Sequence, residues 1–284
     1  MKKVLSLILI LFILFMENGC VAKSDGQYVE VMNESQFIAA VTNEQNIILM
    51  NDIVLGVDEQ TKSWVPLSYT GELNGNNKSI TVYTSTETAN TGIFSTISGN
   101  VKIYDLTIYG IVESTEGNIG SLAGNLGFTS GESEISNVKN YATVSSTGIA
   151  KAYAGGIIGN MSDWTYSGTV TKLRNYGSVS IASYAGGIVG LNKADLSLCA
   201  NMGDITATGG WTYAGGIVAR NYNTVTIFGC YNSGTVSLQH NFAYQAAGIV
   251  GVSAYGKLTV ESCYNNGNIE TTGNSGGGIV GKND

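Results

Sequence analysis

Few side chains in this sequence have the types and spacing that catalysis requires. Ser275 lies in a Gly-x-Ser-x-Gly pattern at residues 273–277, which in hydrolases places a nucleophilic serine on a strand-to-helix turn near a histidine. The chain has one histidine, His240, in a predicted loop. Residues 276–281 match Gly-x-Gly-x-x-Gly, but a dinucleotide site also requires a following helix. The same phrase recurs earlier in the chain, so we interpret it as a repeat unit and predict no cofactor.

The acidic residues are dispersed rather than grouped. Polysaccharide lyases and hydrolases need carboxylates close together, as an acid–base pair or around a metal. We therefore predict no catalytic residues, no metal site and no enzymatic activity. The alternative is a polysaccharide-active enzyme, a lyase or hydrolase, if folding brings some of these acids together. The acids considered occupy different positions of the repeat: Asp163, Asp195, Asp204, Glu261 and Glu270.

Aromatic residues form the best candidate for a binding surface. Tyr153, Tyr184 and Tyr213 each precede an Ala-Gly pair in successive repeats, and Trp164 and Trp211 lie near them in the sequence. Tyrosine rings stack on sugars and are frequent hot spots of protein interfaces. We predict a tyrosine ladder that binds a glycan or a host or matrix protein. The alternative is that the ladder only packs a corner of the fold.

A repeat of about 30 residues positions these side chains. Its apolar residues come in pairs or alternate, and Gly, Asn, Ser and Thr interrupt them every few residues, which is typical of short strands joined by tight corners. Identical corners at a constant period favour coils stacked on one another. The sequence thus predicts an all-β fold, a right-handed parallel β-helix solenoid with a short N-terminal capping helix. Two phrases carry the repeat: AGGIIGN, AGGIVGLN, AGGIVARN, AAGIVGVS and GGGIVGKN, and LRNYGSVS, LCANMGDIT, GCYNSGTVS and SCYNNGNIE.

Equivalent positions of the repeat are expected to form columns. One aliphatic column should fill the interior, and a second should contain leucine and cysteine. These cysteines are interpreted as small core residues and not as disulfide or zinc ligands. Asparagines at one corner should bond through their side-chain amides to the neighbouring coils. The three columns are Ile157, Ile188, Ile217, Ile249 and Ile279; Leu173, Cys199, Cys230 and Cys263; and Asn140, Asn175, Asn201, Asn232 and Asn265.

The N-terminus has the pattern of an export signal. Lys2 and Lys3 precede a predominantly apolar stretch of thirteen residues at 4–16, and Gly19 then precedes Cys20. This resembles a bacterial lipoprotein signal, which implies cleavage after residue 19 and a membrane anchor on a lipidated Cys20. Residues 20–45 are predicted to be the mature N-terminus with a capping helix near 33–41, and residues 46–284 the β-helix. The net charge of −7 argues against a nucleic-acid partner.

The lead-in segments 91–94 and 101–106 resemble the opening coils of bacterial surface β-helix proteins, and the AGGIVG-type phrases resemble the GLUG-motif repeat found in many of them. Such proteins include adhesins and the accessory regions of secreted IgA-cleaving peptidases. The resemblance covers residues 46–284 and implies an adhesin-like role. It brings no catalytic residues with it, and the chain has no His-Glu-x-x-His motif.

We therefore expect an exported, lipid-anchored protein of the bacterial cell envelope that is exposed at the surface and acts as a non-catalytic binding or adhesion scaffold. A secreted protein without the anchor is the alternative location. A third possibility is a structural subunit that docks a partner on its open C-terminal coil. The core phrase at residues 278–281 is followed only by Lys282, Asn283 and Asp284, without a visible cap.

Overall fold

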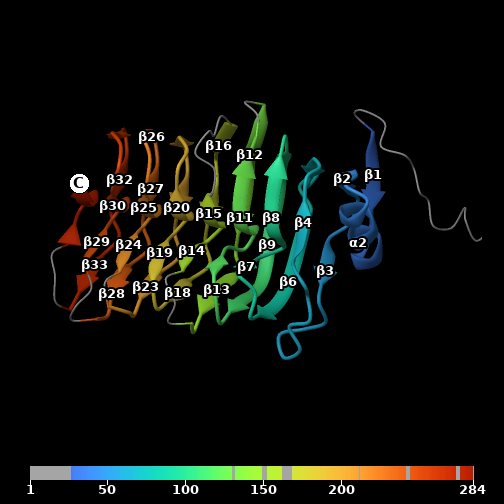
Figure 1. Cartoon of the computed structure of the whole chain (residues 1–284), viewed down its shortest axis with the longest axis horizontal. Coiled ribbons are helices and arrows are strands. Elements are labelled where there is room, and N and C mark those ends of the chain that lie inside the picture. Colours follow the sequence, from blue (N-terminus) through green and yellow to red (C-terminus); the bar gives the residue numbers. More distant parts are fainter. Residues whose placement is uncertain are drawn as a thin grey trace, which may run out of the picture.

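The protein is a parallel β-solenoid of about 7 coils with roughly 31 residues per turn, and its coils succeed one another along a single axis (Figure 1). This confirms the predicted architecture. The structure is a computed structural model, and it describes residues 27–129, 132–148, 152–161, 168–210, 212–240, 244–272 and 276–283. In this described part, no helix is long and apolar enough to cross a membrane.

One typical coil shows how the chain winds. It contains β21 (Leu196–Ser197), β22 (Ala200–Asn201), β23 (Ile205–Ala207), β24 (Tyr213–Gly215) and β25 (Val218–Asn221). The first three belong to a 20-stranded sheet, β24 to a 7-stranded sheet and β25 to an 8-stranded sheet. Each strand pairs in parallel with its equivalent in the neighbouring coils. Equivalent residues are therefore stacked in columns, because every coil repeats the same path.

The other strands of the three sheets follow the same scheme. The 20-stranded sheet also contains β1 (Tyr28–Val31), β2 (Asn46–Leu49), β3 (Ile53–Leu55), β5 (Leu73–Asn74), β6 (Ser79–Thr86), β9 (Lys102–Ser114), β12 (Ser133–Asn140), β13 (Thr143–Ser146), β16 (Gly168–Thr171), β17 (Arg174–Asn175), β18 (Val179–Ile181), β26 (Val225–Phe228), β27 (Tyr231–Asn232), β28 (Val236–Leu238), β31 (Leu258–Glu261), β32 (Tyr264–Asn265) and β33 (Ile269–Thr271). The 7-stranded sheet adds β7 (Asn90–Thr91), β10 (Asn118–Ile119), β14 (Tyr153–Gly155), β19 (Tyr184–Gly186), β29 (Gln245–Ala247) and β34 (Gly276–Gly277). The 8-stranded sheet adds β4 (Leu67–Tyr69), β8 (Phe94–Gly99), β11 (Ala123–Phe128), β15 (Ile158–Met161), β20 (Val189–Asn192), β30 (Val250–Ser253) and β35 (Val280–Asn283).

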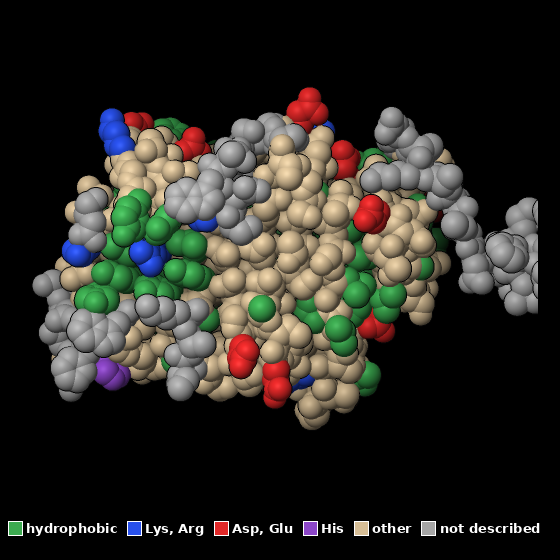
Figure 2. Space-filling view, viewed as in Figure 1, with side chains coloured by type: hydrophobic (Ala, Val, Ile, Leu, Met, Phe, Trp, Pro, Cys, Tyr) green, Lys and Arg blue, Asp and Glu red, His purple; other side chains and the backbone are tan. Residues whose placement is uncertain are grey.

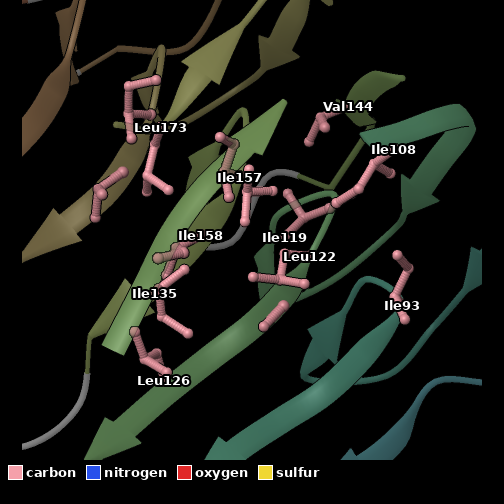
Figure 3. Close-up of a cluster of buried hydrophobic side chains, with 14 of the residues drawn as sticks. Ile93, Ile108, Ile119, Leu122, Leu126, Ile135, Val144, Ile157, Ile158 and Leu173 are labelled. Carbon is pink, nitrogen blue, oxygen red and sulfur yellow. The ribbon is translucent and has the colours of Figure 1, made fainter. Parts of the chain in front are cut away.

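The core is a continuous stack of aliphatic side chains inside the coils. Figure 3 shows part of it, where Ile119, Leu122, Ile157 and Leu173 belong to one cluster. The predicted isoleucine column is confirmed, since its first four members are fully buried. Its last member, Ile279, is only half-buried against the core in the terminal coil.

The predicted asparagine column is also confirmed. Asn140, Asn175, Asn201 and Asn232 are fully buried, and the amide of each donates to the side-chain oxygen of the next at 2.7–2.8 Å. Each amide also donates to the carbonyl two residues further along its own chain segment. Buried polar groups need such partners, so this column joins five coils through their corners.

The predicted capping helix is α2 (Glu34–Thr42), which lies across one end of the solenoid (Figure 1). The Asn33 side chain accepts from the Gln36 backbone N–H at 3.0 Å, as expected for an N-cap. The Gln36 side chain accepts from the N–H of Met32 at 2.8 Å instead of that of Asn33, so the predicted capping box is shifted by one residue. Phe37 is buried against the rings of Trp64 and Phe94.

The 20-stranded sheet bends at one column of residues whose backbone has a positive φ. In β12 the bend falls at Asn137, and in the next coil it falls at Lys172, between β16 and β17. Pairing is in register on both sides, as Ser136 pairs with Thr171 and Lys139 with Arg174. Non-glycine residues rarely adopt this conformation. Its recurrence in six coils marks a built corner at Asp105, Asn137, Lys172, Leu198, Gly229 and Ser262.

Candidate binding surfaces

The predicted tyrosine ladder forms on the 7-stranded sheet. The rings of Tyr153 and Tyr184 stack with centroids 4.9 Å apart, and those of Tyr184 and Tyr213 with centroids 6.0 Å apart. Tyr244 extends the ladder, with its ring centroid 4.9 Å from that of Tyr213. The repeat pattern missed Tyr244 because Gln245 is the residue in register with Tyr213. Tyr244 therefore stacks from one position earlier in its coil.

Most of the inner ladder is covered. Tyr184 is 7% exposed and Tyr213 is 8% exposed, and both pack against Ala219 and Val252 in a small apolar cluster on the outside of the solenoid. Rings buried to this extent contribute to packing. Tyr153 and Tyr244 are more accessible and pack at the margins of the cluster. Binding by this surface remains a prediction.

Arg220 lies among these rings. Its guanidinium carbon is 5.8 Å from the ring centre of Tyr184 and 5.2 Å from that of Tyr222, and Nη1 donates to the hydroxyl of Tyr153 at 3.5 Å. Its Nε is buried and has no hydrogen-bond partner in the described part of the chain. Figure 2 shows hydrophobic side chains gathered over β19, β20, β24 and β25 with a basic side chain among them. This surface therefore combines cation–π contacts with an accessible positive charge.

The repeat pattern did not single out Arg220. In β20 and β30 the residues in register with it are Leu191 and Val252. A cation at a position that is apolar in both neighbouring coils is a signal that column-by-column comparison of the repeats could have found. It marks a place where this coil departs from the scaffold.

A second tyrosine ladder lies on the 20-stranded sheet and was not predicted. The ring centroids of Tyr109 and Tyr141 are 5.1 Å apart, and those of Tyr141 and Tyr176 are 4.5 Å apart with nearly parallel planes. All three rings are exposed, between 39% and 43%. Partial burial, with the neighbouring Tyr176 as a further cause, raises the pKa of Tyr141 above its ordinary value. The Tyr141 phenol therefore stays protonated at neutral pH and can donate a hydrogen bond.

Comparison with solved structures supports the fold. The chain is similar to a "putative immunoglobulin A1 protease" from Bacteroides ovatus, with a TM-score of 0.67, 19% identity, and coverage of 92% of this chain and 84% of that chain. No protein-family model matches this sequence, and no curated protein matches it. The protein is a parallel β-helix. At this identity the likeness shows the fold alone, and the GLUG repeat and the signal peptide remain predictions.

Several sequence-predicted residues of this β-helix lie outside the described residues. These are the lipidation site and the two loop tryptophans, Cys20, Trp164 and Trp211, and also the serine of the Gly-x-Ser-x-Gly pattern, Ser275. His240 is described, and it is half-buried just after β28. Within the described residues, no three or more His, Cys, Asp or Glu side chains are grouped closely enough to hold a metal ion.

The cysteine column lies in the interior, as predicted. Cys199 and Cys230 are buried, Cys263 is half-buried in the terminal coil, and all three are free thiols. The backbone N–H of Cys199 donates to the sulfur of Cys230 at 3.4 Å, and that of Cys230 donates to the sulfur of Cys263 at 3.3 Å. The side-chain hydrogen bond to Cys199 and burial raise the pKa of Cys230. Cys230 therefore packs in the column as a neutral thiol.

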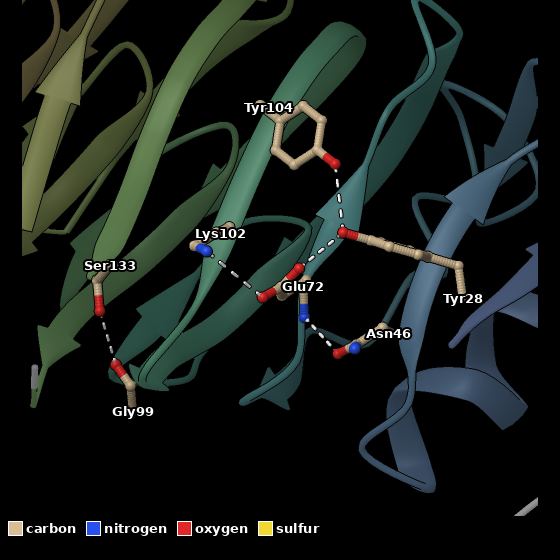
Figure 4. A network of polar contacts seen from close by, with 7 residues as sticks. All are labelled: Tyr28, Asn46, Glu72, Gly99, Lys102, Tyr104 and Ser133. Atoms are coloured by element: carbon tan, nitrogen blue, oxygen red, sulfur yellow. Dashed lines mark hydrogen bonds and ion pairs between the residues drawn. The ribbon is translucent and has the colours of Figure 1, made fainter. Parts of the chain in front are cut away.

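A polar network near the N-terminal cap contains the best-connected carboxylate (Figure 4). Glu72 accepts from the hydroxyl of Tyr28 at 2.7 Å, and its other oxygen lies 4.0 Å from Nζ of Lys102. The Tyr28 hydroxyl also lies 3.3 Å from that of Tyr104. Burial, together with the bond to Glu72, raises the pKa of Tyr28. The network ties β1 to β5 and β9, which is a structural role.

Proposed function

We propose that this β-helix is an exported bacterial surface protein, lipid-anchored through Cys20, that acts as a non-catalytic binding or adhesion scaffold. The observation that carries the proposal is the tyrosine ladder of β14, β19 and β24 with Arg220 among its rings. Parallel pairing holds these groups on a rigid sheet with coils about 4.8 Å apart. The ligand therefore meets a preorganised surface, which lowers the entropic cost of binding.

The surface offers chemistry for a glycan or for a host or matrix protein. The accessible edges of Tyr153 and Tyr244 can contact a sugar ring or an apolar side chain. The half-buried guanidinium of Arg220 can donate through its Nη groups to a carboxylate, a sulfate or a carbonyl. Tyrosine and arginine are also the residues most enriched in protein-interface hot spots.

Binding across an array of glycans and matrix proteins tests this proposal. The wild-type chain without its signal is compared with Arg220→Ala and with Tyr153→Ala/Arg220→Ala. Both variants change accessible side chains and leave the buried Tyr184 and Tyr213 in place. Tyr83→Ala, in β6 on the 20-stranded sheet, is the matched control. We expect one class of ligand to be bound by wild type and control and lost by both variants. Absence of any ligand, or unchanged binding by the double variant, would contradict the proposal.

Labelling with radioactive palmitate tests the anchor. We expect incorporation in cells that express the wild-type chain and none with Cys20→Ala, because thioether lipidation requires the thiol. A wild-type chain that is exported without any label would support a secreted protein instead.

Catalysis is the second candidate, and the name of the structural neighbour motivates it. Immunoglobulin A1 and a panel of polysaccharides are incubated with the purified chain. Fragments of the antibody, or new reducing ends, would overturn the non-catalytic assignment. We expect neither product above a heat-inactivated control.

The terminal coil motivates a role in assembly. Val260, Ile269 and Val280 are only half-buried there, whereas their counterparts Ile227, Val236 and Val250 in the preceding coil are fully buried. A partner that covers this coil would bury them. Light scattering of the mature chain distinguishes a self-associating protein from a monomer.

A further inference from the structure

An open groove runs along the bend of the 20-stranded sheet. Two adjoining cavities of about 460 Å³ and 340 Å³ make up the groove, and they share Lys172 and Arg174. Side chains before the bend, such as Thr171, form one wall, and side chains after it, such as Tyr231, form the other. The left-handed residues of the bend lie between the two walls, so the corner that bends the sheet also creates the groove.

The groove has a positive centre. Lys172 is exposed and Arg174 is half-buried. Among the described residues, ion pairs are formed by Lys62 and by Lys102, and neither Lys172 nor Arg174 takes part in one. Lys172 at the bend and Arg174 on the wall after it are two cations without an ion-pair partner, and together they form a site for an anionic group. A guanidinium can hold a carboxylate or a sulfate through two hydrogen bonds.

The two ends of the groove differ from its centre. Toward the N-terminus it is lined by Asp105 and Glu134, and the Asp105 carboxylate accepts from Nδ2 of Asn137 at 2.6 Å. Toward the C-terminus it is lined by Leu198 and Tyr231. A polymer with a negative charge on every unit, such as a nucleic acid, would place charges against the two carboxylates. A ligand with neutral hydroxyls at one end and an anion in the middle fits this order of charges.

Tyrosine rings lie on the side of the groove that carries Arg174, and one of them, Tyr231, lines it. Asn175 is fully buried, so strand alternation turns the side chains of both Arg174 and Tyr176 outward. The exposed ladder of Tyr109, Tyr141 and Tyr176 therefore runs beside the groove. Nearer the C-terminus, Tyr231 stacks on the following tyrosine of its column, Tyr264, with ring centroids 5.2 Å apart.

We propose that this groove binds an acidic oligosaccharide. A carboxylate or sulfate of the sugar is held by Lys172 and Arg174, and the apolar face of a neighbouring ring packs on the exposed tyrosines. Asp105 and Glu134 accept hydrogen bonds from hydroxyls of an uncharged sugar unit. The site lies on the 20-stranded sheet, whereas the Arg220 surface lies on the other two sheets. It is therefore a second binding site beyond the proposed function.

Calorimetric titration of the mature chain tests the site with three probes: a hexamer of alternating sulfated and neutral sugars, a hexamer of alternating uronic acid and neutral sugars, and neutral maltohexaose. We expect one or both acidic probes to bind and maltohexaose not to bind. Which acidic probe binds identifies the anionic group. The Lys172→Gln/Arg174→Gln variant should lose at least about tenfold in affinity, and higher salt should weaken wild-type binding because the contact is ionic.

Lys78→Gln/Lys257→Gln removes the same charge away from the groove and should bind within twofold of wild type. Tyr141→Ala/Tyr176→Ala should also weaken binding, since it removes the exposed ring edges beside the groove. Arg220→Ala should have no effect, which separates this site from the proposed function. Equal binding of maltohexaose, no binding of either acidic probe, or unchanged affinity of the Lys172→Gln/Arg174→Gln variant would each overturn the proposal. The salt dependence is measured on the wild-type chain, so this part of the test stands even if a variant fails to fold.

Discussion

Gly187 lies directly against the side chain of Asn201, fourteen residues later in the chain. A Cβ atom on Gly187 would be 2.5 Å from the amide carbon of Asn201 and would also meet the carbonyl oxygen of Gly216. The same contact recurs in other coils, between Gly156 and Asn175, for example. The AGGIVG-type phrase supplies the glycine of this contact, and the second phrase of the repeat supplies the asparagine. The second glycine of each pair makes room for the asparagine column.

Gly187→Ala should destabilise the protein by about 3 kcal/mol, because the added methyl group overpacks a buried corner that backbone atoms enclose. Chemical denaturation followed by circular dichroism measures the change. Gly278→Ala is the matched control. It occupies the same column in the terminal coil, where a Cβ meets nothing within 4 Å, and should change stability by less than about 0.5 kcal/mol. Equal effects of the two substitutions would contradict this account of the glycine column.

Asn201→Ala should cost about 2–4 kcal/mol, because the buried amide of Asn175 loses one of its two acceptors and the side-chain oxygen of Asn232 loses the donor from Asn201. The same denaturation experiment measures the loss. Asn266→Ala changes an exposed residue at the same corner in the terminal coil and should be nearly neutral. A neutral Asn201→Ala would show that the column does not contribute to stability.

The two tyrosine ladders should respond differently to truncation. Tyr184→Ala should lose about 2–4 kcal/mol, because it removes a ring that is 7% exposed and stacked on both sides. Tyr141→Ala should lose less than about 1 kcal/mol, since its ring is 43% exposed. Thermal unfolding of the two variants compares them directly. The reverse order would contradict the assignment of the inner rings of the first ladder, Tyr184 and Tyr213, to packing and of the second ladder to an accessible surface.

The buried thiols of the interior column should be unreactive in the folded protein. The pKa of Cys230 is raised by its side-chain hydrogen bond to Cys199 and by burial, so thiolate is scarce at neutral pH. In a Cys20→Ala chain, an aromatic disulfide reagent at pH 8 should label at most the half-buried Cys263 until denaturant exposes Cys199 and Cys230. Rapid labelling of Cys199 or Cys230 without denaturant would contradict the interior placement.

The same pKa shift predicts the direction of a pH effect. Because the pKa of Cys230 is higher in the folded than in the unfolded state, its contribution to stability is complete below about pH 9 and falls as the pH rises further. Denaturation at pH 8 and pH 10.5 should show a smaller alkaline loss for Cys230→Val than for wild type.

Much of the fold could be predicted because it repeats. Ile188 and its equivalents recur at one period, so their shared interior position follows from the pattern alone. The tyrosines before the Ala-Gly pairs were predicted for the same reason. Tyr244 and Arg220 were missed, because Tyr244 lies out of register and Arg220 replaces an apolar residue in its column. A residue that departs from the repeat has no equivalents in other coils from which its position could be predicted. Its contacts are known only from the way neighbouring coils pack.

The sequence by itself determined the solenoid, its interior columns and its asparagine corner, because these depend on the alternation of side chains and on an interval that each coil repeats. Only the tertiary structure decided which outward residues are accessible. It covered Tyr184 and left Tyr176 exposed, and it turned Lys172 and Arg174 into the centre of a groove. The physical reason is that the bend of the sheet decides which outward side chains are exposed to solvent and which charged side chains lie close together. That bend arises from left-handed residues of unlike type, such as Asp105 and Leu198, which share no sequence signature.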